Sequence, residues 1–139
     1  MSFREKLRQS RFLRFALVGT AGFVVDESVL FVMQRFIGLD PLTGRVVSIL
    51  AAMTFTWWGN RNLTFHDHKA FGAAAMAREW MRFVAANLLG ALINYGSFAA
   101  LVHFAPTPAN NPYLATAVGV GIGLLFNFTL SKRLVFRVR

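Results

Sequence analysis

The chain has 139 residues, of which 55% are hydrophobic and 15% are charged, and its mean hydropathy is +0.48. A soluble domain carries about 25% charged residues, so these values and the long apolar runs exclude an ordinary soluble protein and predict an integral membrane protein. The sequence has no cysteine, which excludes disulfides and thiol chemistry. Its net charge of +9 comes from basic segments between apolar runs, which favours membrane topology and contact with anionic lipid over nucleic-acid binding.

The sequence predicts an all-α membrane protein with a short helix before its membrane domain. Residues 1–11 alternate basic side chains with Phe3 and Leu7, so we expect an amphipathic interfacial helix in the headgroup layer. Four transmembrane helices are predicted within a membrane domain of residues 12–139, because each apolar segment is close to the roughly 20 residues that cross a bilayer. The four segments cover residues 12–36, 42–59, 80–104 and 113–130.

The distribution of Lys and Arg predicts the orientation of these helices. Only two of the 15 basic residues, Arg35 and Arg45, lie in the first and third connections. The positive-inside rule therefore predicts that both termini and the middle loop face the cytosol. The other thirteen are Arg4, Lys6, Arg8, Arg11, Arg14, Arg61, Lys69, Arg78, Arg82, Lys132, Arg133, Arg137 and Arg139.

The two halves of the sequence resemble each other when each helix of the first half is aligned with its counterpart in the second. Each half contains two predicted helices, an even number, so both halves would have the same orientation in the membrane. We therefore expect two parallel two-helix repeats that are related by an axis along the membrane normal. The matched polar positions are Arg14 with Arg82, Asp26 with Asn94, and Arg61 with Lys132.

Two neighbouring carboxylates, Asp26 and Glu27, lie within the first predicted span. Asp26 is twelve residues beyond Arg14, or about 18 Å along a helix, which places it near the bilayer centre. Charges at that depth usually face a cavity or a partner. Adjacent helical residues point about 100° apart, so we expect Asp26 alone to face the interior. Glu27 is expected in a helix contact, at a subunit interface, or protonated.

Small and polar residues recur every four positions in the second and fourth predicted helices. Two interpretations stay open: close helix packing, or a polar groove that leads to the cytosolic face. In the second interpretation, a polar headgroup would pass Asp26, Asn94, Thr56, Asn60 and Asn127.

Four basic residues are expected at the cytosolic ends of the four helices. Positive-inside topology explains most basic clusters, but a ring of cations beside a groove also suits a phosphate. The candidates for substrate phosphate binding are Arg14, Arg61, Arg82 and Lys132. No catalytic arrangement and no metal-ligand pattern is recognisable, so the sequence predicts neither an enzyme nor a cofactor.

Three segments, FLRFALVGTAGFVVDE, TFTWWGNRNLTF and LLFNFTLSKRLVF, resemble the GtrA-like family. The resemblance runs from about Arg11 to Phe136, with Ser131 departing from the family's asparagine. It implies a flippase that carries a polyprenyl-phosphate-linked sugar across the cytoplasmic membrane for polysaccharide biosynthesis, with a membrane glycosyltransferase as partner. By the same resemblance, the family's aspartate maps onto Asp26 and its Asn-Arg pair onto Asn60 and Arg61.

Two other functions remain open from the residues alone. One is a small proton-coupled multidrug-type exporter, in which Asp26 would exchange a proton for a cation. The other is a non-transporting membrane scaffold for a glycosyltransferase. Because four helices form only a thin wall around a groove, we expect a homodimer.

Overall fold

The computed structural model describes residues 1–138, except for seven side chains. These are the side chains of Pro41, Leu42, Tyr95, Phe98, Pro112, Tyr113 and Thr116. Arg139, which was counted with the C-terminal basic residues, lies outside the described residues. Every regular element in the described chain is helical, which confirms the predicted all-α class. The chain divides into two compact units, Met1–Trp80 and Met81–Arg139.

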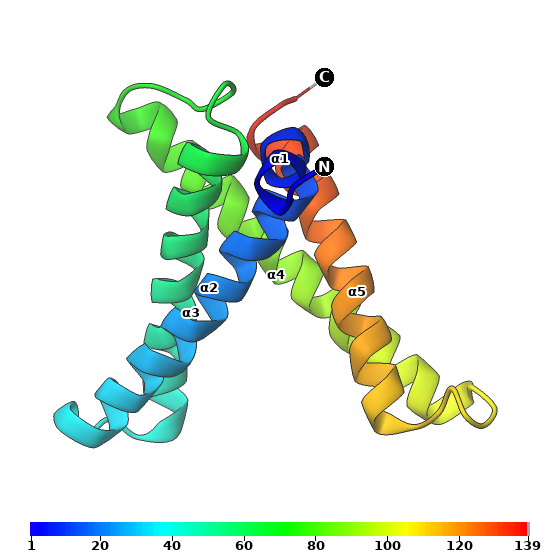
Figure 1. The fold of residues 1–139 in the computed structure, drawn as a ribbon. Helices are drawn as coiled ribbons and strands as arrows, with labels where there is room; N and C mark the ends of the chain where they lie inside the picture. The colour runs from blue at the N-terminus through cyan, green and yellow to red at the C-terminus, as the bar shows by residue number, and fades with distance from the viewer. Residues whose placement is uncertain (139) are drawn as a thin grey trace. The chain divides into compact units, whose positions relative to one another are not determined.

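The first unit contains a short helix and a helical hairpin (Figure 1). Helix α1 covers Phe3–Gln9, and α2 covers Arg11–Val32 and continues into the π turn η1 at Met33–Ile37. Helix α3 covers Pro41–Gly59 and continues into a second π turn, η2, at Asn60–Thr64. The structure thus divides the predicted interfacial segment 1–11 at Ser10, between α1 and α2.

Side-chain caps explain where these helices begin. Ser2 and Glu5 form a capping box at α1, and the Ser10 hydroxyl accepts a hydrogen bond from the backbone N–H of Leu13 at α2. Asp40 caps α3, and Pro41 occupies the first helical turn, where its missing N–H costs nothing. These caps satisfy backbone donors that would otherwise lack partners at each helix start.

Helices α2 and α3 lie side by side because small residues permit a close approach. A Cβ added at Gly22 would overlap the side chain of Thr56, and one added at Gly59 would lie 2.8 Å from Cγ1 of Val18. At the end of the hairpin that carries η2, the rings of Phe15 and Phe65 meet edge to face at 6.4 Å. Close backbone contact and one aromatic pair therefore hold this hairpin together.

The second unit contains most of α4, Ala73–Phe104, together with α5, Pro112–Leu130, and the π turn η3 at Ser131–Val135. A Cβ added at Gly90 would overlap Asn127, and one added at Gly123 would lie 3.0 Å from Cβ of Asn94. Helices α4 and α5 therefore also approach each other through glycines. Helix α4 begins at Ala73, well before the predicted span 80–104, whereas the other predicted spans start within one residue of a helix start.

The π turns η2 and η3 begin at equivalent positions of the two helical hairpins. They start at Asn60 and Ser131, which the sequence match between the halves places opposite each other. In each turn the first residue's carbonyl accepts a bond from the amide five positions later, at Phe65 (2.8 Å) and Phe136 (2.9 Å). Both of these phenylalanines are buried. The two halves thus end their second helix in the same way.

Within the part of the chain that the structure describes, three helical segments are long and apolar enough to cross a membrane: Arg11–Ile37, Ala73–Phe104 and Ala117–Val135. Helix α3 is not among them, although it is 19 residues long. Its sequence includes Arg45, two tryptophans and several hydroxyl residues, which lower its mean hydropathy. The chain's abundant exposed phenylalanine, leucine and valine side chains are those expected at a lipid-facing surface.

Candidate functional site

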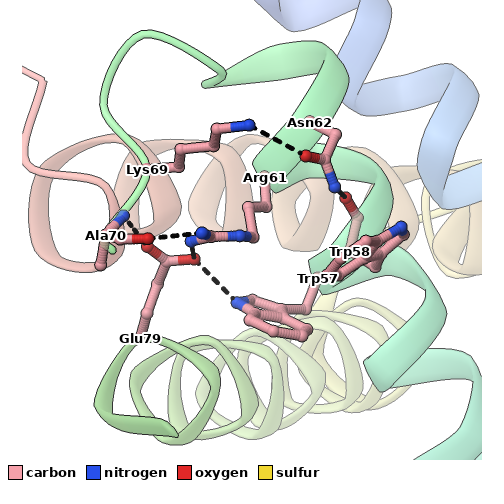
Figure 2. Close-up of polar contacts among 7 residues, drawn as sticks. All are labelled: Trp57, Trp58, Arg61, Asn62, Lys69, Ala70 and Glu79. Carbon is pink, nitrogen blue, oxygen red and sulfur yellow. Dashed lines mark hydrogen bonds and ion pairs between the residues drawn. The ribbon is translucent and has the colours of Figure 1, made fainter. Parts of the chain in front are cut away.

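A buried ion pair between Arg61 and Glu79 is the most extensively bonded polar cluster in the first unit (Figure 2). Nη1 of Arg61 lies 2.8 Å from Oε1 of Glu79, and the two side chains are only 5% and 3% exposed. The same carboxylate accepts bonds from Trp57 Nε1 at 3.0 Å and from the backbone N–H of Ala70 at 2.7 Å. Arg61 also donates to the Ala70 carbonyl. Four bonds therefore join η2, the following loop and the first turns of α4.

This cluster pairs the charge of Arg61, which the sequence named as a candidate for phosphate binding, with a carboxylate of the protein. Its guanidinium lies 5.9 Å from the ring centroid of Trp57 and faces Glu79, so the charge is compensated inside the protein. Beside it, Asn62 bonds the Trp58 carbonyl and accepts from Lys69, both drawn in Figure 2.

Arg14, the second predicted phosphate ligand, closes the end of α1. Its Nη1 donates to the carbonyls of Leu7 (2.8 Å) and Arg8 (2.7 Å), and its Nη2 lies 3.5 Å from the Thr64 carbonyl in η2. The last carbonyls of a helix have no hydrogen-bond donor within the helix. Arg14 therefore supplies the missing donor. Nε of Arg14 is buried without a partner among the described residues.

The two predicted cations of the second unit have no such partners. Arg82 is exposed on α4, and Lys132 is half-buried in η3. Across residues 1–138, neither side chain forms an ion pair or a hydrogen bond. The equivalent positions of the two halves therefore differ: Arg14 and Arg61 are held by internal bonds, whereas the side chains of Arg82 and Lys132 have no such partner within residues 1–138.

Asp26 and Glu27 on α2 both contact Arg45 on α3. Nη1 of Arg45 lies 3.2 Å from Oδ2 of Asp26 and 3.4 Å from Oε1 of Glu27. Both contacts form because the long side chain of Arg45 on α3 spans the angle between the two carboxylates. Asp26 is 13% exposed and Glu27 is 52% exposed. Oδ1 of Asp26 is buried with no hydrogen bond among the described residues.

The remaining headgroup-path candidates face the interiors of their own helix pairs. Thr56 presents its methyl group to Gly22, and its hydroxyl bonds the Ala52 carbonyl of its own helix. Asn60 is buried within η2, where its Oδ1 accepts a bond from Thr64. In the second unit, Asn94 lies against Gly123 and Asn127 lies against Gly90. Oδ1 of Asn127 is buried without a hydrogen-bond partner within the described chain.

Each unit also has a surface groove at an equivalent place. The first, about 420 Å³, is lined by Leu7, Arg8, Arg14, Leu17, Val18, Leu63 and His66. The second, about 560 Å³, is lined by Arg82, Arg133, Leu134, Arg137 and Val138. In the sequence match between the halves, Arg14 corresponds to Arg82 and Leu63 to Leu134. Each groove therefore combines an arginine from the first helix of its hairpin, α2 or α4, with a leucine from the π turn η2 or η3.

Glu79 was not recognised as a functional residue from the sequence. It lies in the Ala-rich start of α4, which was assigned to the middle loop, and its partner Arg61 is 18 residues away. A pair at this separation leaves no periodic signal. The one available clue was an isolated acidic residue beside Trp80, next to a basic segment.

The chain was compared with known protein families and with curated proteins. Residues 14–139 match the family described as GtrA/DPMS, transmembrane domain, which covers both helical hairpins and all three π turns. No curated protein matches the sequence. The match covers most of the chain and confirms the resemblance recognised in its motifs. Together with the three long apolar helices, it identifies a multi-pass membrane protein of glycosyl-lipid processes, and the chain belongs to the GtrA/DPMS transmembrane-domain family.

Proposed function

We propose that the protein flips a polyprenyl-phosphate-linked sugar across the cytoplasmic membrane, to supply a membrane glycosyltransferase on the outer side. The observation that carries this proposal is the pair of equivalent grooves, each of which joins an arginine to apolar side chains. A polyprenyl phosphate has the same two parts, an anionic headgroup and a long apolar chain. Arginine binds phosphate by charge-assisted hydrogen bonds.

In the proposed arrangement, α3 also spans the membrane and brings the number of spans to four. The two hairpins form parallel repeats with both termini in the cytosol. The shared π turns and the matched glycine contacts support the repeat. The excess of basic residues at the termini and in the middle loop supports the orientation. The polar side chains of Asn94 and Asn127, which face glycines of the opposite helix, would then lie along the headgroup's route. A homodimer would complete the wall around that route.

The cations take different parts in this proposal. Arg82 and Lys132 receive the phosphate, since their charges are not compensated within residues 1–138. Arg14 forms the wall of the first groove while it holds α1 in place. Arg61 acts as a positioning residue through Glu79. The rival proton-coupled exporter would need Asp26 to bind a substrate cation, and Arg45 already lies 3.2 Å from one oxygen of that carboxylate.

A vesicle assay tests the proposal. Purified protein is reconstituted into liposomes, and three probes are added outside: isoprenyl phosphate linked to glucose, isoprenyl phosphate linked to mannose, and isoprenyl phosphate without sugar. We expect at least one sugar-linked probe to enter faster than into protein-free vesicles, and Arg82→Gln to slow its entry. Equal entry of all three probes with and without protein would contradict transport. Arg35→Gln, at the far end of the first hairpin, is the control for loss of one positive charge.

A further inference from the structure

The groove of the second unit gathers three arginines around a small apolar surface. Arg82 comes from α4, Arg133 from η3 and Arg137 from the chain after η3, beside Leu134 and Val138. Across residues 1–138, none of the three guanidinium groups forms an ion pair or a hydrogen bond, and no acidic residue lines the groove. Three like charges around one cavity repel each other, so a bound anion would lower the energy of this arrangement.

The backbone at Arg137 provides an independent observation. Arg137 has φ 51°, in the left-handed region that L-residues with a side chain disfavour. A bond from the Val138 amide to the Lys132 carbonyl, 2.7 Å, closes this turn. The same closure ends η1, where the Leu39 amide bonds the Met33 carbonyl and the left-handed residue is Gly38. Glycine is therefore the residue that this turn favours, and an arginine in its place indicates that the side chain is needed.

The first unit shows that the π turn does not require the charges of Arg133 and Arg137. In the alignment that places η2 on η3, Arg133 corresponds to Asn62 and Arg137 corresponds to His66. The π turn η2 forms with those residues just as η3 forms with arginines. Membrane orientation does not require these particular positions either, because basic residues are abundant elsewhere in the terminal segments.

We propose that Arg82, Arg133 and Arg137 form the binding site for a lipid-linked phosphate in the second unit, with the lipid chain running over Leu134. This inference rests on the proposed function and adds two ligands, Arg133 and Arg137, to it. Three arginines supply more donors than one phosphate ester has free oxygens, so the site also suits a diphosphate. The left-handed turn places Arg137 at the groove. The next residue, Val138, is buried at 7% exposure.

Binding of farnesyl phosphate to the full chain in dodecyl maltoside micelles tests this site. Thermophoresis would compare the parent with Arg82→Gln, Arg133→Gln and Arg137→Gly. Each variant removes a charge-assisted hydrogen bond to the phosphate. Each should therefore weaken the binding of farnesyl phosphate by about tenfold or more. Arg137→Gly is the most informative variant, because glycine suits the turn and should leave thermal stability unchanged or higher. Arg4→Gln, on the exposed face of α1, is the matched control and should bind like the parent.

Further probes distinguish the source of the phosphate. Farnesol tests the need for the phosphate, inorganic phosphate tests the need for the chain, and phosphatidylglycerol represents an ordinary anionic bilayer lipid. Weaker binding of farnesol, inorganic phosphate and phosphatidylglycerol than of farnesyl phosphate supports the proposal. It is overturned if Arg137→Gly binds farnesyl phosphate as tightly as the parent, if Arg4→Gln loses as much affinity, or if phosphatidylglycerol binds equally well. Vesicle transport by the parent with unchanged binding in the three variants would refute this site alone. Lost binding without any parent transport would refute the transport function alone.

Discussion

Removal of Glu79 should destabilise the first unit more than any other single loss of charge. Glu79→Ala deletes the acceptor of three hydrogen bonds, from Trp57, Arg61 and the Ala70 amide. It also leaves the Arg61 guanidinium, 5% exposed, without its carboxylate. Removing one partner of a buried ion pair costs about 3–5 kcal/mol. We expect that loss in the free energy of unfolding, measured by tryptophan fluorescence during reversible unfolding in mixed micelles of dodecyl maltoside and SDS.

A second variant separates buried charge from lost contacts. In Arg61→Met combined with Glu79→Leu no charge stays buried, so this protein should recover about 2 kcal/mol or more relative to Glu79→Ala. Glu27→Gln is the control, since Glu27 is 52% exposed beside Arg45, and it should change stability by less than about 1 kcal/mol. If Glu79→Ala unfolded like the parent, the cluster would not hold η2 to α4. If the double variant still moved lipid-linked sugar, Arg61 would be a positioning residue and not a phosphate ligand.

Three further predictions concern packing, the α1 contact and pH. Gly90→Ala should cost about 1–3 kcal/mol of unfolding free energy by overpacking against Asn127, and Asn127→Ala should rescue it; no rescue would contradict the contact. Arg14→Lys should lose one of two bonds to the end of α1, and faster amide hydrogen exchange in residues 3–9 would reveal it, whereas unchanged exchange would argue against the cap. Desolvation raises the pKa of Asp67, but its own backbone N–H and Arg11 outweigh this and hold the pKa below 3.8. The stabilisation is therefore present above pH 3.8 and is lost as pH falls through the folded-state pKa. Because Arg11 and Asp67 are both substantially exposed, Asp67→Asn should lower the free energy of unfolding by less than about 1 kcal/mol at pH 7. Acid titration of the parent and the variant should show this difference in stability vanish at low pH.

Local sequence signals accounted for the helices and their ends. Long apolar runs predicted the class because backbone groups in a bilayer must bond within their own segment. The apolar run at 42–59 predicted the start of α3 to within one residue. The two matched segments that begin at Asn60 and Ser131 corresponded to two π turns with the same closing bond. None of these signals depends on which side chains meet in the folded protein.

The partners of the charged side chains could not be obtained in the same way. Arg45 joins Asp26 and Glu27, and Arg61 joins Glu79, between elements that are well separated along the sequence. The sequence named Arg61 and Arg82 alike as candidates for phosphate binding, whereas only the structure separated the buried one from the exposed one.

Composition and periodicity by themselves determined that this chain is helical and membrane-embedded, because those properties depend on the average polarity and spacing of neighbouring residues. Tertiary structure alone decided which arginines are neutralised inside the protein and which remain open to an anion. The physical reason is that a charge responds to what lies within a few ångströms of it, and for Arg61 and Arg137 those neighbours are set by how the π turns end and where the following chain goes.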